Sequence, residues 1–146
     1  TAKQEVSIPE EQKLIVLQEV NKFSEERLVD EIAGLNFRFP HIVLAQAKLE
    51  SNNFRSYLFK ENNNMFGMKQ AKSRANTAAR TERGHAYYDN WVESLYDYAL
   101  YHNAYLNKLR TESQYYNYLS QNYAEDPQYV SKLKGIIEKE NLKDKF

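Results

Sequence analysis

Residues 61–90 form a polar segment that interrupts a sequence with an otherwise helical pattern. The segment contains Gly67 and Gly84 and few aliphatic side chains, so it lacks the apolar face that a packed helix needs. A connection of this length is uncommon in a compact domain and usually has a binding or lid role. We therefore expect an exposed loop or a short β-hairpin lobe, inserted into a domain that is otherwise all α.

Apolar residues before this segment recur at steps of three or four, and residues typical of helix ends bracket each run. The pattern predicts a helix over residues 9–23 with Leu14, Leu17 and Phe23 on its apolar face, a second from the Ser24 cap to Gly34, a third from Pro40 to Glu50 or Ser51, and one or two further turns over residues 54–60.

The helical pattern returns after residue 90. A capping box of Asn90 and Glu93 predicts the start of a helix in which Trp91 is the first core residue. A shorter helix is expected over residues 112–122, and Asp126-Pro127 predicts the start of the last one. No repeat or linker is recognisable, so we expect a loose tail at residues 1–8 and a single domain over residues 9–146.

Composition excludes several classes of function. The formal net charge of zero gives no overall attraction to nucleic acid, and no apolar run approaches the roughly 20 residues of a membrane span. The absence of cysteine excludes disulfides and thiolate sites. The histidines show no metal-ligand spacing, so we expect no metal and no cofactor. We expect a monomer. No signal peptide is recognisable, but the chain begins at Thr1, so this decides nothing about its compartment.

Tyrosine is unusually frequent, with 12 residues in a chain of 146. A tyrosine joins an apolar ring to a hydrogen-bonding tip, so an excess suits a groove that stacks on sugars or other amphipathic ligands. A small core filled with large side chains would explain the same composition, and the sequence leaves both interpretations open.

Glu50 ends an apolar run that begins at Pro40, and Ser51 follows it directly. Poor hydration and the partial negative charge of a helix C-terminus both disfavour an ionised carboxylate there, so we expect a raised pKa. A carboxyl that stays protonated near neutral pH can act as a general acid, for example on a glycosidic oxygen. The alternative is a side chain that only caps the helix or points into solvent.

Three blocks of sequence resemble the glucosaminidase family of peptidoglycan hydrolases, glycoside hydrolase family 73. The first is AQAKLES at residues 45–51 with NNMFGMK at residues 63–69. The second is YYDNWVESLYDYALY at residues 87–101, and the third is YAEDPQYVSKL at residues 123–133. The blocks have the order and spacing of the family, which makes the resemblance specific.

The resemblance implies a mainly α, lysozyme-like fold with a cleft between a helical lobe and a small, flexible β-lobe at about residues 61–90. It implies cleavage of the β-1,4 bond after N-acetylglucosamine in peptidoglycan glycan chains. Such an enzyme needs no metal and acts outside the cytoplasm, in the periplasm, in the cell wall or after secretion.

The resemblance also assigns roles to single residues. Glu50 matches the general acid. Tyr123 matches a tyrosine that faces this acid across the cleft and orients the acetamido group of the substrate or a water molecule. The alternative for Tyr123 is packing before the Asp126-Pro127 turn.

Glu82 is the candidate for the second carboxylate, which would activate water. It departs from the family pattern because no aromatic residue follows it, and a pairing with the adjacent Arg83 would lower its pKa. Members without a clear base are thought to use the 2-acetamido group of the substrate as the nucleophile, and both mechanisms stay open.

Tyr88 aligns with a family tyrosine that precedes an aspartate, and we expect it to line the sugar subsites. Ser51, Asn64 and Phe66 are further candidates for substrate binding. For Asn64, Phe66 and Gly67 a structural role in the turn is the favoured alternative.

The polar segment is basic, with Glu82 as the only acid among five cations: Lys69, Lys72, Arg74, Arg80 and Arg83. These charges would attract polyanionic peptidoglycan in a salt-sensitive manner, or they belong to a solvated loop. Two other functions also remain open. One is a muramidase or lytic transglycosylase on the same fold, and the other is an inactive peptidoglycan-binding module.

Overall fold

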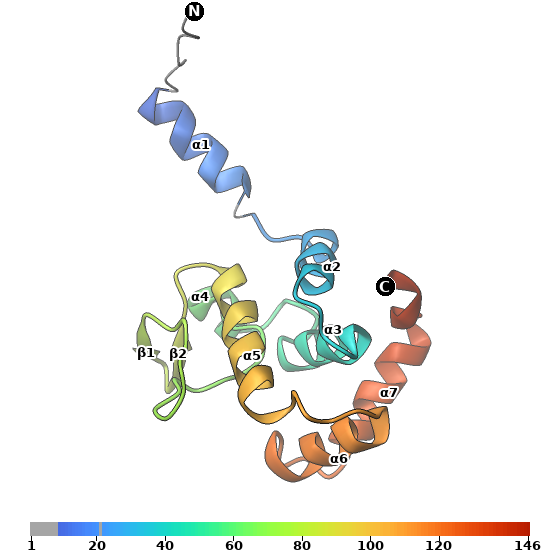
Figure 1. Ribbon diagram of the computed structural model, residues 1–146. Coiled ribbons are helices and arrows are strands. Elements are labelled where there is room, and N and C mark those ends of the chain that lie inside the picture. The colour runs from blue at the N-terminus through green and yellow to red at the C-terminus, as the bar shows by residue number, and fades with distance from the viewer. Residues whose placement is uncertain (1–8, 21) are drawn as a thin grey trace, which may run out of the picture.

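The computed structural model describes residues 9–20 and 22–146 and shows a mainly helical protein with one small sheet (Figure 1). This confirms the predicted fold class, while the tail predicted at residues 1–8 lies outside the described residues. In chain order the elements are α1 (Glu10–Val20), α2 (Glu25–Gly34), α3 (Pro40–Glu50), α4 (Tyr57–Asn62), β1 (Arg80–Glu82), β2 (His85–Tyr87), α5 (Trp91–Tyr105), α6 (Glu112–Asn122), α7 (Tyr129–Lys139) and the 3₁₀ helix η1 (Leu142–Lys145).

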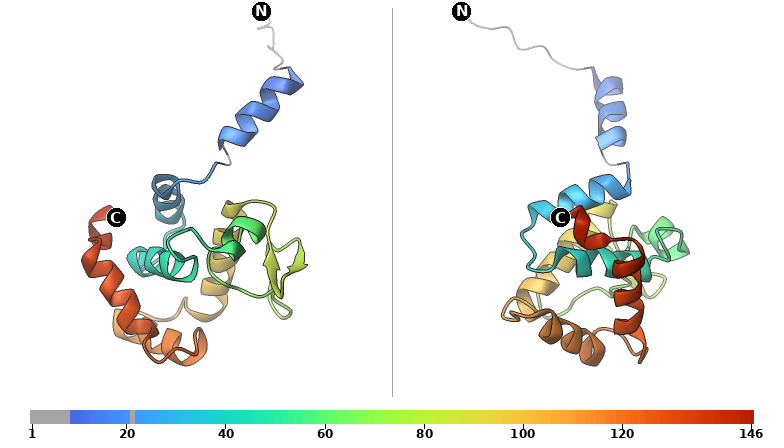
Figure 2. Two further views of the ribbon diagram at one scale, coloured as in Figure 1. Left: turned by 180° about the vertical axis from the view of Figure 1, so that it is seen from behind. Right: turned by 90° about the vertical axis from the view of Figure 1, so that its right-hand side faces the viewer.

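Helix α3 lies at the centre of the helical body and contacts α2, α7 and η1 (Figures 1 and 2). Residues 41–48 are all buried, as expected for a helix that is apolar on most sides. Lys48 is the charged exception, and its ammonium group forms ion pairs with Glu25 and, at 2.9 Å, with Glu140. These contacts hold the last turn of α3 in place, and Glu50 is the residue at its end.

Helix α1 differs most from the expectation. It ends at Val20 and extends away from the rest of the protein, with Leu14 60% exposed (Figure 2). Phe23 lies beyond the helix and packs against Phe54 and Trp91, with ring centroids at 4.7 and 5.3 Å. The predicted apolar face is therefore split, and the side chain of Leu17 lies outside the described residues.

The helices after the polar segment begin near their predicted caps. Asn90 accepts a hydrogen bond from the backbone of Glu93 at 3.1 Å, and Trp91 is buried as expected. The last helix begins later than predicted, at Tyr129. The carboxylate of Asp126 accepts from the backbone of Gln128 at 2.9 Å, so Asp126-Pro127 forms a turn before the helix.

The polar segment contains the predicted β-hairpin, in which β1 and β2 pair antiparallel with Glu82 opposite His85. The connecting residues Arg83 and Gly84 both have positive φ, as a tight two-residue hairpin turn requires. Asn64 joins this hairpin to the preceding loop, because its amide nitrogen donates to the carbonyl of Ala86 at 2.9 Å.

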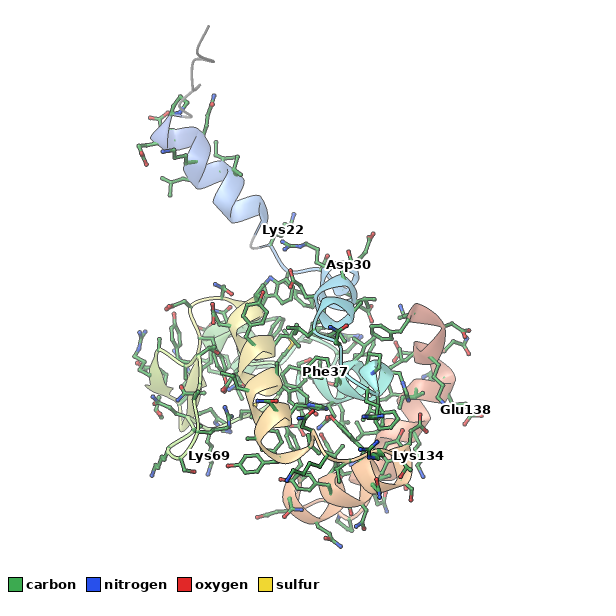
Figure 3. The ribbon with its side chains drawn as sticks, in the orientation of Figure 1. Lys22, Asp30, Phe37, Lys69, Lys134 and Glu138 are labelled. Carbon is green, nitrogen blue, oxygen red and sulfur yellow. The ribbon has the colours of Figure 1, made fainter. Side chains whose placement is uncertain are left out.

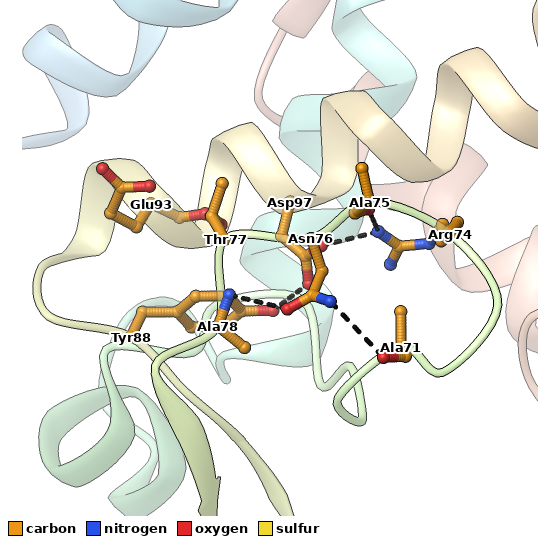
Figure 4. Close-up of polar contacts among 9 residues, drawn as sticks. All are labelled: Ala71, Arg74, Ala75, Asn76, Thr77, Ala78, Tyr88, Glu93 and Asp97. Carbon is orange, nitrogen blue, oxygen red and sulfur yellow. Dashed lines mark hydrogen bonds and ion pairs between the residues drawn. The ribbon is translucent and has the colours of Figure 1, made fainter.

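The rest of the polar segment is tied to α5 (Figure 4). The guanidinium of Arg74 pairs with the fully buried carboxylate of Asp97 at 2.6 Å, and the hydroxyl of Tyr88 donates to the other carboxylate oxygen. Thr77 donates to the carbonyl of Glu93. Apolar side chains such as Phe66 fix the start of the segment in the core, whereas these buried polar contacts place the part around Arg74 and Thr77.

Candidate active site

A groove of about 440 Å³ lies between the end of α3 and the polar segment. It is lined by Glu50, by residues 66–74 of the polar segment, by Tyr101 and Tyr105 at the end of α5, and by Asn122 and Tyr123 at the end of α6. Most of its polar wall therefore comes from one loop, whose position depends on the Arg74–Asp97 contact.

Among the residues that the structure describes, Glu50 is the only acidic one that lines the groove. Its carboxyl is partly buried, and burial raises its pKa, while a hydrogen bond with Tyr129 and the nearby charge of His85 partly oppose this shift. The direction agrees with the expectation from the sequence. A raised pKa keeps the carboxyl protonated to a higher pH than an exposed glutamate, as a general acid requires.

Gly67 lies directly against this carboxyl. Its φ is +68°, and a Cβ atom at this position would lie 2.8 Å from Oε2 of Glu50. The backbone conformation therefore favours glycine here, and a Cβ atom would displace the carboxyl end of Glu50. The resemblance had favoured a structural role for Gly67, and its contact with Glu50 connects that role to the groove.

Tyr123 lines the groove beside Glu50. Its hydroxyl donates to the carbonyl of Phe66 at 2.7 Å, and its ring stacks on Tyr129 with centroids 6.0 Å apart. Burial raises its pKa well above the usual range, so the hydroxyl stays neutral. Since the hydroxyl proton is donated to the Phe66 carbonyl, the hydroxyl oxygen can accept a hydrogen bond from a ligand.

The family model of the glucosaminidases, described as mannosyl-glycoprotein endo-β-N-acetylglucosaminidase, matches residues 29–142. The chain belongs to the glucosaminidase family. It is a glycoside hydrolase of the endo-β-N-acetylglucosaminidase type, as the motifs predicted.

The fold is similar to the crystal structure of the catalytic domain of the autolysin Auto from Listeria monocytogenes. The TM-score is 0.57 at 25% sequence identity, and the match covers 97% of this chain and 100% of that one. This confirms the mainly α, lysozyme-like architecture. A comparison with curated proteins finds no significant match.

Three of the predicted substrate-binding residues of this glucosaminidase lie behind the groove wall. Ser51 is buried, and its hydroxyl donates to the carbonyl of Ala47 at 2.6 Å. Asn64 is buried and holds the hairpin, and Tyr88 is 0% exposed with its hydroxyl on Asp97. Their polar groups already have hydrogen-bond partners within the protein, and a direct contact of these residues with sugar stays a prediction.

Of the two remaining candidates, Phe66 lines the groove and Glu82 does not. Phe66 reaches the groove wall and stacks on Tyr98 at 4.4 Å, so it is both part of the core and part of the site. Glu82 does not line the groove, and its carboxylate pairs with Arg80 at 2.8 Å. Arg83, the expected partner of Glu82, donates instead to the side chain of Asn62 at 2.9 Å.

Two residues at the site were not assigned to it from the sequence. Tyr129 was placed on the buried face of the last helix, yet its hydroxyl lies beside Glu50 and lowers the pKa of this carboxyl. Gln46 donates to the same hydroxyl at 3.2 Å. The sequence signal that could have indicated Gln46 is its polar amide within the apolar run of α3, where the structure buries it completely.

The described residues contain no group of three or more His, Cys, Asp or Glu side chains that could hold a metal ion. Within the same part of the chain, each helix is too short or too polar to cross a membrane.

Proposed function

We propose that this glucosaminidase hydrolyses peptidoglycan outside the cytoplasm and cleaves the β-1,4 bond after N-acetylglucosamine, with Glu50 as the general acid. The observation that carries this proposal is the Glu50 carboxyl, the one carboxyl that the described residues place in the groove, with a raised pKa and with Gly67 directly against it. The similarity to an autolysin catalytic domain supports peptidoglycan as the substrate. The catalytic domain is proposed to comprise residues 9–146.

In the first step, Glu50 donates its proton to the glycosidic oxygen as the bond from this oxygen to C1 breaks. The carbonyl oxygen of the 2-acetamido group attacks C1 and forms a cyclic intermediate. The free lone pair of Tyr123 accepts the acetamido N–H, which stabilises the positive charge that develops on this group. In the second step water attacks C1 and transfers a proton to the Glu50 carboxylate, which restores the acid.

This mechanism gives Glu82 no direct part. The Glu82→Gln variant is expected to reduce kcat by less than about tenfold, whereas removal of a general base costs roughly 10²–10⁴-fold. The physical reason is its place outside the groove wall, in a pair with Arg80. Initial rates on purified peptidoglycan, with Glu61→Gln as a matched lobe variant, would measure this. A loss above a hundredfold in a folded Glu82→Gln variant would instead assign Glu82 as the base.

The groove also carries positive charge near the acid. Lys69 and Lys72 line it and form no ion pair within the described part of the chain, whereas Arg74 is paired with Asp97 (Figure 4). We propose that the two lysines attract the carboxylates of the peptide stems, as expected for a polyanionic substrate.

The double variant Lys69→Gln/Lys72→Gln is therefore expected to raise KM several-fold at low salt and to make KM less dependent on salt. Screening weakens contacts between exposed charges, so the two curves should converge at high ionic strength. The control is Lys134→Gln, which removes a lysine of α7 on the opposite side of the body (Figure 3). An unchanged salt dependence of the double variant would show that the lysines belong to a solvated loop.

The test of the proposed function is the chemistry of the products. Peptidoglycan digested by the protein and reduced with borohydride should release fragments that end in reduced N-acetylglucosamine. Fragments that end in N-acetylmuramic acid would indicate a muramidase, and anhydro ends a lytic transglycosylase. Binding to sacculi without release of fragments would indicate a binding module, which the enzyme family makes the weaker alternative.

A further inference from the structure

A chain of buried hydrogen bonds crosses the core and ends at Tyr129, beside Glu50. The hydroxyls of Tyr115 and Tyr98 are 2.6 Å apart, and the Tyr98 hydroxyl donates to Oε1 of Gln46. Nε2 of Gln46 donates to the hydroxyl of Tyr129 at 3.2 Å, and the Tyr129 hydroxyl lies next to the Glu50 carboxyl, whose pKa it lowers. The four residues behind Glu50 are between 0% and 3% exposed, so no solvent competes for these bonds.

The amide of Gln46 fixes the direction of every bond in this chain. Its oxygen can only accept, so Tyr98 must donate to it, and Tyr115 must then donate to Tyr98. Its nitrogen can only donate, so the Tyr129 hydroxyl must accept from it. The single proton of Tyr129 is thereby left to point at Glu50.

Packing alone does not account for a glutamine at this position. The neighbouring buried positions of α3 are mostly apolar, and burying an amide is unfavourable unless both of its ends are hydrogen-bonded. An aliphatic residue of similar size would fill the same space without this requirement. Gln46 meets it at both ends, with partners from α5 and α7.

We infer that Gln46 and Tyr129 are positioning residues for the acid: the Gln46 amide orients the Tyr129 hydroxyl, and this hydroxyl donates to the Glu50 carboxyl. The inference rests on the proposed function of Glu50. With one carboxyl oxygen occupied by the Tyr129 donor, the acidic proton is held on the other oxygen, which is the one left for the substrate.

The charged and titratable neighbours of Glu50 come from several elements. Tyr129 approaches from α7, Tyr123 from the end of α6 and His85 from β2. Lys48 belongs to α3 itself, but its ammonium group is turned to Glu25 and Glu140. Of these neighbours, Tyr129 is the one whose hydroxyl, by hydrogen bonding, most lowers the pKa of Glu50.

The Tyr129→Phe variant tests the inference. A donor to a carboxylate favours its charged form, so losing this donor raises the pKa of Glu50 further. The alkaline limb of the kcat/KM profile should therefore move to higher pH. The value of kcat at the optimum should fall about three- to tenfold, the range of one hydrogen bond, with KM little changed.

Two further variants distinguish the orienting effect of the Gln46 hydrogen bond from an effect of core packing. Gln46→Met keeps the volume of the side chain but no longer orients Tyr129, so it should shift the alkaline limb in the same direction. Tyr116→Phe is the control, since Tyr116 is a buried tyrosine of α6 that the chain does not include. Tyr116→Phe should show the same pH profile of kcat/KM as the unmodified protein.

Titration of the Glu50 carboxyl carbon by ¹³C NMR provides a readout that does not need activity. A higher midpoint in Tyr129→Phe and Gln46→Met, but not in Tyr116→Phe, is the expected result. Unchanged midpoints in both variants would overturn the inference, even if Glu50→Gln is inactive and the proposed acid is correct. An active Glu50→Gln variant would overturn the proposed function itself, whatever the midpoints are.

Discussion

The Glu50→Gln variant is expected to lose nearly all hydrolysis of peptidoglycan, with kcat lower by about 10²–10⁴-fold. Glutamine has the shape of glutamate but carries no acidic proton, so the glycosidic oxygen would leave without protonation. Within residues 9–20 and 22–146, no second carboxyl lines the groove that could take over this step. Release of reduced-end fragments from purified peptidoglycan, measured by mass spectrometry, checks the result.

Folding must be preserved for this comparison to be informative. Glutamine can still accept from Tyr129 through its amide oxygen, so the melting temperature should change little. Glu93→Gln is a suitable control, because Glu93 lies on α5 and is not part of the groove wall. A Glu50→Gln variant with normal rates and products would show that another group donates the proton.

The Gly67→Ala variant is expected to reduce kcat by about a hundredfold, although it adds only one methyl group near the site. This methyl group would lie 2.8 Å from Oε2 of Glu50, so the carboxyl must move from its place beside Tyr129. The left-handed backbone at φ +68° adds a cost of roughly 1–2 kcal/mol to the free energy of folding. Rates on peptidoglycan and denaturant unfolding curves would measure both effects.

Gly84→Ala provides the matched control for this prediction. Gly84 has a similar φ of +72°, but a Cβ atom there would meet nothing within 4 Å. The two variants should therefore lose similar stability from backbone strain, while Gly84→Ala keeps normal activity per folded molecule. Equal loss of activity in both would mean that the contact of Gly67 with Glu50 has no functional effect.

Much of the fold was predictable because its signals are local. Pro40 and Ser24 mark helix starts through their own backbone and side-chain preferences, and the structure begins α3 and α2 at these points. The polar composition of residues 61–90 likewise predicted a lobe with a hairpin. The start of α7 was placed too early because the Asp126 side chain stabilises a turn instead of a helix cap.

The groove was predictable only in part. Glu50 and Tyr123 were identified from the chemistry at a helix end and from the resemblance, and the structure brings both to the groove wall. Tyr88 has the same residue type as a sugar-binding tyrosine, but a partner from α5, Asp97, takes its hydroxyl. The role of Glu82 remains a prediction to be tested by its glutamine variant.

The sequence by itself determined the helices, the polar lobe, the enzyme family and the candidate acid, since each depends on residue types at short spacing. The tertiary structure alone decided which polar side chains meet. Gln46 and Tyr129 are 83 positions apart, yet they share a hydrogen bond beside Glu50. Such a contact depends on the packing of α7 against α3, because helix periodicity specifies which face is buried but not which atoms that face will meet.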